Sequence, residues 1–392
     1  MLKKSISIFV VLSMLISILS ISALAQEQKK LPGILEITLE EAIKFAFENN
    51  TNIKDLKDKC KDMDDEYDKL SWKVNNIKSI PNKVNFSSEN EYALYKGYPL
   101  EQLKFKYDEL LKLKELTEKI TNYNIESLSY GIQETIKELE YLKKVKQKLE
   151  KDLAIAKLKL QLEIINQNQL DQAKIAVTQM DTNMKKAYDG LKTQKNALKA
   201  LVGVDRTVTL NIELPEKEFK EIGDINLDEI KDKAMTDRGD AILVTNNLNS
   251  KKMNYELKDY YKAYIAYDEY KDTLDEYNKA KDRYENDLND IKEKVGNAYE
   301  TVITLDGEYK DALETYKNTL ELHKMNKLRY SLGMISLIDF MGSEIVLDKA
   351  NNDLKKSLDK NILAKKMFEI SYTLGDSDTI GLLKAAQVPT AQ

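Results

Sequence analysis

Apolar residues recur every 3.5 positions over a long stretch of this chain, and that spacing constrains the fold more than any other feature. The series begins at Ile125 and ends at Leu160, and ten steps cover the 35 positions between them. A mean step of 3.5 is the heptad period of a coiled coil, in which an apolar seam on one helix packs against a partner helix. Glycine and proline, at 13 and 5 of 392 residues, are scarce, whereas proteins built from sheets need both for their many turns. We therefore predict long helices with few breaks.

The pattern of helix starts and ends occurs twice. Residues 38–50 and 226–238 align at a spacing of 188 positions, and each segment opens with a residue suited to cap a helix and an acid three positions later. Glycines at 203 and 375 follow the apolar ends of the two units. This duplication predicts a mainly α fold, made of two tandem repeats of long antiparallel coiled-coil helices with a short strand, at 207–212, in the linker between them.

The duplication also divides the chain into parts. The expected parts are a signal peptide at 1–25, a first repeat at 36–203 with a non-helical tip at 80–99, a linker at 204–225, a second repeat at 226–375 and a disordered tail at 376–392. The first part combines two lysines, an apolar run and small residues before Gln26, which is typical of a cleaved secretory signal peptide. The mature chain is therefore expected to be exported across the cytoplasmic membrane and to act in the cell envelope.

Residue types that carry chemistry are few. The chain holds one histidine, His323, and one cysteine, Cys60, so neither a zinc site nor a Cys–His catalytic pair is expected. Its acidic clusters lack the glycine and the terminal glutamate of a calcium loop. A net charge of −5 argues against a nucleic-acid partner, since such proteins usually present a basic face. We predict no enzyme, no cofactor and no metal site.

Three segments carry a resemblance to a known family. Segment 37–42 (ITLEEA), segment 294–299 (KVGNAY) and segment 329–333 (RYSLG) with Asp339 six residues later look like motifs of the TolC family of outer-membrane efflux proteins. Their order and the repeat spacing agree with that family over about residues 36–375. The resemblance implies a TolC-like helical barrel subunit. It also implies a homotrimeric export duct that works with a membrane-fusion adaptor and an ABC or other inner-membrane pump.

In that family, helix turns at one end of the subunit form the entrance of the duct, where the adaptor binds. By resemblance, the entrance residues of this chain are Tyr330, Gly333, Ser336 and Asp339 in the second repeat and Asn166, Gln169 and Asp171 in the first. Asp339 matches the first of two aspartates that narrow the entrance in well-studied members, but Gly342 stands at the second. Ile335 stands where an arginine partner would be. A closed gate ringed by acids is therefore not expected.

The strands that carry members of the family through an outer membrane are not evident in this chain. One pair of repeat segments aligns at 188 positions and the other at 170, so the first repeat holds only a short excess. A membrane strand needs about 9–11 residues, and two strands with a loop exceed that excess. Segment 84–95 could form one short hairpin, and the second repeat is expected to reverse within 265–290. The sequence does not support outer-membrane insertion, and the alternative function is a structural coiled-coil envelope protein without transport activity.

Overall fold

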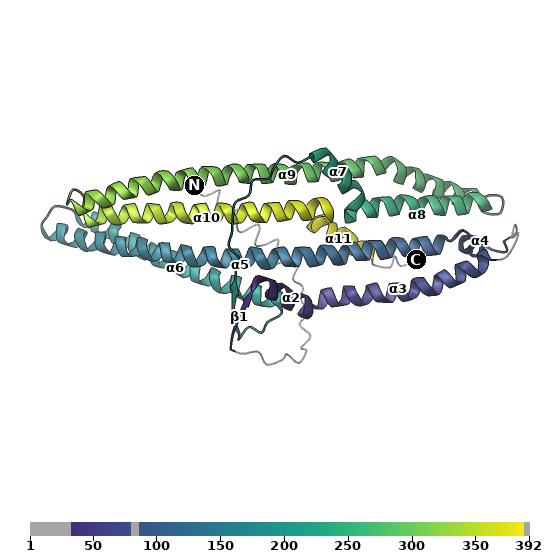
Figure 1. Ribbon diagram of the computed structural model, residues 1–392, viewed down its shortest axis with the longest axis horizontal. Coiled ribbons are helices and arrows are strands. Elements are labelled where there is room, and N and C mark those ends of the chain that lie inside the picture. Colours follow the sequence, from purple (N-terminus) through teal and green to yellow (C-terminus); the bar gives the residue numbers. More distant parts are fainter. Residues whose placement is uncertain (1–32, 80–85, 388–392) are drawn as a thin grey trace.

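Two very long helices run along the molecule (Figure 1). The computed structural model describes residues 33–79 and 86–387, and the expected signal peptide lies outside them. Helix α5 (Tyr98–Gln161) has 64 residues and α9 (Tyr267–Ser331) has 65, which at 1.5 Å per residue gives each a length of roughly 95 Å. The single proline of α5 stands in its first turn, where a missing N–H costs nothing.

Each long helix is flanked by two shorter helices that follow one another along its length (Figure 1). The flanking helices are α3 (Thr51–Lys78) and α6 (Gln167–Val202) on α5, and α8 (Gly239–Tyr261) and α10 (Leu337–Thr373) on α9. The two repeats meet where α5 packs beside α8 and α10. The predicted mainly α fold of two tandem antiparallel helical repeats is confirmed.

A small two-stranded sheet lies near the middle of the molecule. Strand β1 (Ile34–Thr38) pairs in parallel with β2 (Thr209–Glu213), and the register runs from Ile34 opposite Thr209 to Thr38 opposite Glu213. The strand predicted in the linker is confirmed, shifted by one or two residues. Its partner strand β1 was not predicted, because the first helical repeat was expected to begin at residue 36.

Matching short helices begin the two repeats. Helix α2 (Leu39–Asn49) starts with the predicted capping box, in which the N–H of Glu41 donates to Thr38 Oγ1 at 3.2 Å and the N–H of Thr38 donates to the Glu41 carboxylate at 2.8 Å. Helix α7 (Leu227–Asp237) starts at Asn226, whose side chain accepts from the N–H of Glu229. These local contacts satisfy donors that a helix start leaves free.

The non-helical tip predicted at 80–99 is wrong for its second half, and so is the hairpin suggested at 84–95. Helix α4 (Glu89–Lys96) begins at Ser88, whose hydroxyl accepts from the N–H of Glu91, and ends at Gly97 with φ 83°. A cap at one end and a left-handed glycine at the other favour a short helix over paired strands. Residues 80–85 lie outside the described part. The second repeat reverses at 262–266, so the turn begins three residues before the predicted window of 265–290 and overlaps only its first two residues.

The disordered tail predicted at 376–392 is wrong for most of its length. Helix α11 (Ser377–Ala386) starts with a capping box between Asp376 and Thr379, and its Ile380 and Leu383 are buried. Two apolar residues are too few to reveal a helical period, yet they suffice to pack this helix against α5 and α8. Residues 388–392 lie outside the described part. Within that part, no helix combines the length and the apolar character needed to span a membrane.

Candidate functional site

The two turns that the resemblance assigns to the entrance lie at the same end of the molecule (Figure 1). One joins α5 to α6 at 162–166 and the other joins α9 to α10 at 332–336. Farther along the bodies, α5 and α10 lie side by side, and Lys144 of α5 forms an ion pair with Asp348 of α10. The fold thus places at one end two turns that stand 170 positions apart in the sequence.

The second-repeat turn ends α9 through a pair of crossed backbone hydrogen bonds. The N–H of Met334 donates to the carbonyl of Arg329 at 2.8 Å, and the N–H of Gly333 donates to the carbonyl of Tyr330 at 2.9 Å. This is the Schellman ending of a helix, which requires a left-handed residue just past the last turn. Gly333 supplies that residue with φ 71°, at no steric cost.

The first-repeat turn has the same hydrogen bonds but no glycine. The N–H of Ile164 donates to the carbonyl of Lys159 at 2.8 Å, and the N–H of Glu163 donates to the carbonyl of Leu160 at 3.0 Å. Glu163 takes the left-handed position with φ 57°, and no other residue except glycine has a positive φ in the described part. A side chain in this conformation costs about 1–2 kcal/mol, so the first turn is the more strained of the two.

Each turn then starts the next helix with a capping box. In the second repeat, the N–H of Asp339 donates to Ser336 Oγ at 3.1 Å, and the Ser336 hydroxyl donates to Asp339 Oδ2 at 2.7 Å. In the first repeat, the N–H of Gln169 donates to Asn166 Oδ1 at 3.0 Å, and the N–H of Asn166 donates back to the Gln169 side chain. Four of the seven residues expected at the site therefore build the two helix starts.

Both expected site acids are held by their own helices. Hydrogen bonds from the Ser336 hydroxyl and backbone lower the pKa of the Asp339 carboxyl below its usual value. The Lys174 ammonium, at 2.8 Å, and the Gln167 amide, at 3.0 Å, do the same for the pKa of Asp171. Both carboxylates are ionised at neutral pH; Asp339 caps the start of α10, and Asp171 links two side chains within α6.

A stack of rings ties α9 to α10 beside the second turn. The Tyr330 ring lies parallel to the Phe340 ring, with 4.9 Å between their centroids. The His323 ring, two turns earlier on α9, lies 5.6 Å from the Phe340 ring. His323 Nδ1 lies 3.0 Å from the Ser343 hydroxyl of α10. In the part of the chain described, no group of three or more histidine, cysteine or acidic side chains is arranged to hold a metal ion.

Sequence reasoning missed the most exposed feature of this end. We define the apolar tip as Leu158, Leu162 and Ile164 from the first turn and Leu328, Leu332 and Met334 from the second. All six side chains are at least 60% exposed. The signal was present, because each residue of the first trio has an apolar residue 170 positions later. An apolar turn at the end of a long polar body is unusual, and such patches mark contact surfaces.

Comparisons of the whole chain place this geometry among known structures. No protein-family model matches the chain, and no curated protein matches it by sequence. The outer membrane protein VceC from Vibrio cholerae is 10% identical over 88% of this chain and 96% of its own, with a TM-score of 0.59. The Campylobacter jejuni CmeC outer membrane channel is 13% identical over 93% of both chains, with a TM-score of 0.59. The open-state Neisseria gonorrhoeae MtrE outer membrane channel is 11% identical over 91% of this chain and 96% of its own, with a TM-score of 0.60.

The chain has the TolC-like fold. The matches cover 85–93% of this chain, which confirms the resemblance inferred from the repeat spacing and the motifs. At 8–13% identity the likeness concerns the fold. The TolC-like fold accounts for the pairing of the two turns at one end, because each repeat supplies one antiparallel helix pair to that end.

Proposed function

We propose that this chain is a subunit of an export or efflux conduit, or of a spacer within one, in the cell envelope. In this proposal three copies surround a duct, and the apolar tip meets a membrane-fusion adaptor that is coupled to an ABC or other inner-membrane pump. The mature chain reaches this place by export across the cytoplasmic membrane. The TolC-like fold and the duplicated tip support the proposal.

The apolar tip is the observation that carries it. Six exposed apolar side chains lie on two turns at the same end of the molecule, while the bodies of α6 and α9 are rich in charged residues. Capping boxes, a ring stack and Schellman endings fix the turns rigidly. A rigid apolar end that is supplied twice by each subunit suits repeated contacts with the subunits of a ring-shaped partner.

The oligomeric state tests the conduit first. We expect light scattering of the full chain, purified from the envelope of its host, to give a mass three times that of one chain. A mass of one chain at every accessible concentration would contradict the proposal. That outcome would favour a structural coiled-coil envelope protein without transport activity.

The tip is tested by site-specific photo-crosslinking in living cells. Crosslinkers at Leu162 and Leu332 are expected to capture a membrane-fusion adaptor, identified by mass spectrometry. Matched crosslinkers at Ile175 and Val346, which are 55% and 58% exposed farther along α6 and α10, are expected to capture none. Equal capture from all four positions would show that the tip has no special role.

A further inference from the structure

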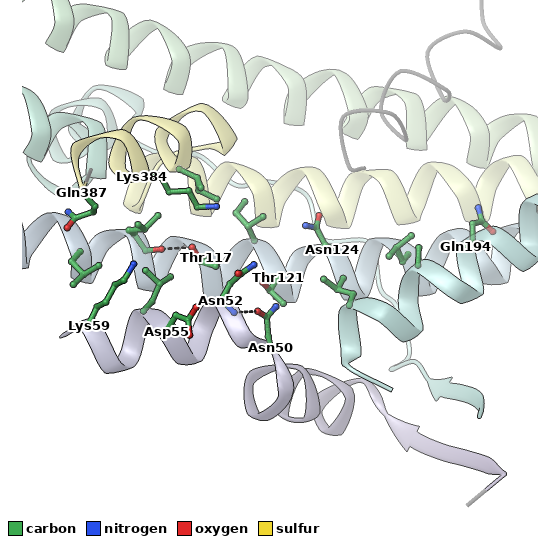
Figure 2. Close-up of a pocket in the computed structure, with 18 of the residues that line it drawn as sticks. Asn50, Asn52, Asp55, Lys59, Thr117, Thr121, Asn124, Gln194, Lys384 and Gln387 are labelled. Atoms are coloured by element: carbon green, nitrogen blue, oxygen red, sulfur yellow. Dashed lines mark hydrogen bonds between the residues drawn. The ribbon is translucent and has the colours of Figure 1, made fainter. Parts of the chain in front are cut away.

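A cavity of about 370 Å³ lies where the first repeat meets the C-terminal helix α11 (Figure 2). Its floor is aliphatic and includes Leu110, Leu113 and Ile120 of α5, with Leu56 of α3 and Ile380 of α11 beside them. All five side chains belong to the buried part of the molecule. The volume lies near the lower end of the range for small-molecule sites, about 300–1,000 Å³.

The second repeat shows why this cavity is open. Gly239 begins α8 and corresponds to Thr51, which begins α3, at the spacing of 188. Helix α11 lies directly on Gly239, so that an added Cβ would be 2.7 Å from the Leu383 side chain and 3.2 Å from that of Thr379. In the first repeat the end of α6 lies on the junction between α2 and α3, where a Cβ added at Gly203 would be 2.6 Å from Asn49 Cβ, and the cavity lies beside this contact.

The mouth of the cavity carries unpaired positive charge. Lys59 of α3 and Lys384 of α11 stand at one end, and uncharged amides, Asn124 and Gln194, stand towards the other (Figure 2). Neither lysine forms an ion pair with any carboxylate of the described ranges, whereas Lys57, one half-turn away, pairs with Glu118. One acid, Asp55, lines the wall, so two cations face a single carboxylate there.

We propose that this cavity binds a single-chain amphipathic carboxylate. The alkyl chain lies on the aliphatic floor between α3, α5 and α6, and the carboxylate lies between the Lys59 and Lys384 ammonium groups. The volume suits one chain and is too small for a two-chain lipid. Because one lysine comes from α3 and the other from α11, the ligand links the C-terminal helix to the first repeat, far from the apolar tip. This site is independent of the proposed export function.

Calorimetric titration of the full chain tests the site with dodecanoate as the probe, used below its micelle concentration. We expect saturable binding of one dodecanoate per chain. Dodecyltrimethylammonium, which has the same alkyl chain and a cationic head, is expected to bind at least tenfold more weakly. Equal affinity for the two probes, or no binding of dodecanoate, would overturn the proposal.

Replacing the two lysines distinguishes the contribution of the head-group contact to binding from that of the aliphatic floor. The double variant Lys59→Met and Lys384→Met keeps the length of both side chains and is expected to weaken dodecanoate binding about tenfold or more, since a charge-assisted hydrogen bond contributes that much. The double variant Lys54→Met and Lys61→Met has the same change in net charge on exposed positions of α3 outside the cavity. It is expected to bind as the unaltered chain does, and an equal loss in both double variants would contradict the assignment.

A larger side chain on the floor tests the location. Ala197 of α6 lines the cavity and is partly exposed, so Ala197→Trp is expected to fill the space while circular dichroism remains unchanged. We expect dodecanoate binding to be lost. Unchanged binding would place the ligand elsewhere. A concentration-dependent increase in mass that Ala197→Trp abolishes would instead make the cavity a contact between copies of the chain, and would overturn the proposal.

Discussion

Each repeat has a junction between two consecutive helices near the middle of the molecule, α2–α3 in the first repeat and α7–α8 in the second. The two junctions are stabilised by different contacts. In the first repeat Asn50 joins α2 to α3, and its side-chain oxygen accepts from the N–H groups of Asn52 and Ile53 at 3.0 and 3.3 Å. At the corresponding position of the second repeat, 188 residues later, Arg238 joins α7 to α8, and its side chain makes no cap hydrogen bond. The first junction is an ordinary helix cap beside an open cavity. The second is a buried ionic cluster beneath α11.

The cluster around Arg238 ties together three segments of the second repeat. Its side chain is fully buried, and its Nε and Nη2 donate to the two carboxylate oxygens of Asp240 at 2.9 and 2.8 Å. Nη1 donates to the backbone carbonyl of Ser371 at 2.6 Å, and Nη2 also lies 3.2 Å from Asp376. The guanidinium therefore joins the start of α8 to the end of α10 and the start of α11. The anchor needs several differences from the first repeat, because Asn52 stands at the position of Asp240 and α11 follows only the second repeat.

The largest expected effect separates the two junctions directly. Arg238→Met removes the buried cation between Asp240 and Asp376 and, among the described residues, leaves only Lys294, 3.9 Å from Asp240. We expect the free energy of unfolding to fall by about 3–5 kcal/mol. Asn50→Ala removes a cap and is expected to lower it by about 1 kcal/mol. Urea unfolding followed by circular dichroism measures both. Equal losses would mean that the cluster holds the fold no more firmly than a cap does.

The next effect is a dependence of stability on pH. Burial alone would raise the pKa of the Asp376 carboxyl, but the N–H of Thr379 and the Arg238 guanidinium together lower it below the usual value of 3.8. A lowered pKa in the folded state gives stability that is present above pH 3.8 and is lost as the pH falls through the folded-state value. We expect Asp376→Asn to lower the free energy of unfolding by about 1.5–3 kcal/mol at pH 7, the contribution of a hydrogen bond to a charged group.

The difference in the free energy of unfolding between the unaltered chain and Asp376→Asn separates this carboxyl group from the other titrating acids. We expect this difference to shrink steadily as urea unfolding is repeated at lower pH, below 3.8. Asp378→Asn, which removes the same charge at an exposed position two residues away, serves as the matched control. A difference that stays constant with pH would show that the Asp376 carboxylate is not the source.

Much of this architecture could be predicted because its signals are local. The capping box at Thr38, the cap at Asn226 and the glycine that ends α6 each act within a few residues of the helix end that they define. The residues of the candidate site came instead from the family resemblance. Strand β1 could not be, because five residues form a strand only with a partner 175 positions away. No feature of the neighbouring sequence indicates that Arg238 is buried. It is one of four arginines among the 61 lysine and arginine residues of the chain.

The smallest effect concerns the two turns of the candidate site. Their backbone conformations match, but the left-handed residue is Glu163 in the first turn and Gly333 in the second. Glu163→Gly relieves a strained conformation in the first turn, and we expect it to raise the free energy of unfolding by about 1 kcal/mol. Gly333→Ala introduces that strain into the second turn and is expected to lower it by a similar amount. The space around Gly333 is open, so the cost comes from φ rather than from a clash.

Two further substitutions separate backbone strain from loss of charge at the first turn. Glu163→Asn keeps a residue that tolerates the left-handed region and removes the same charge, so it should stabilise less than Glu163→Gly does. Gly307→Ala, in the middle of α9 with open space around it, should stabilise the helix, opposite in sign to Gly333→Ala. If Gly333→Ala and Gly307→Ala shifted urea unfolding in the same direction, helix propensity rather than φ would control the turn. The strain at Glu163 would then no longer distinguish the first repeat from the second.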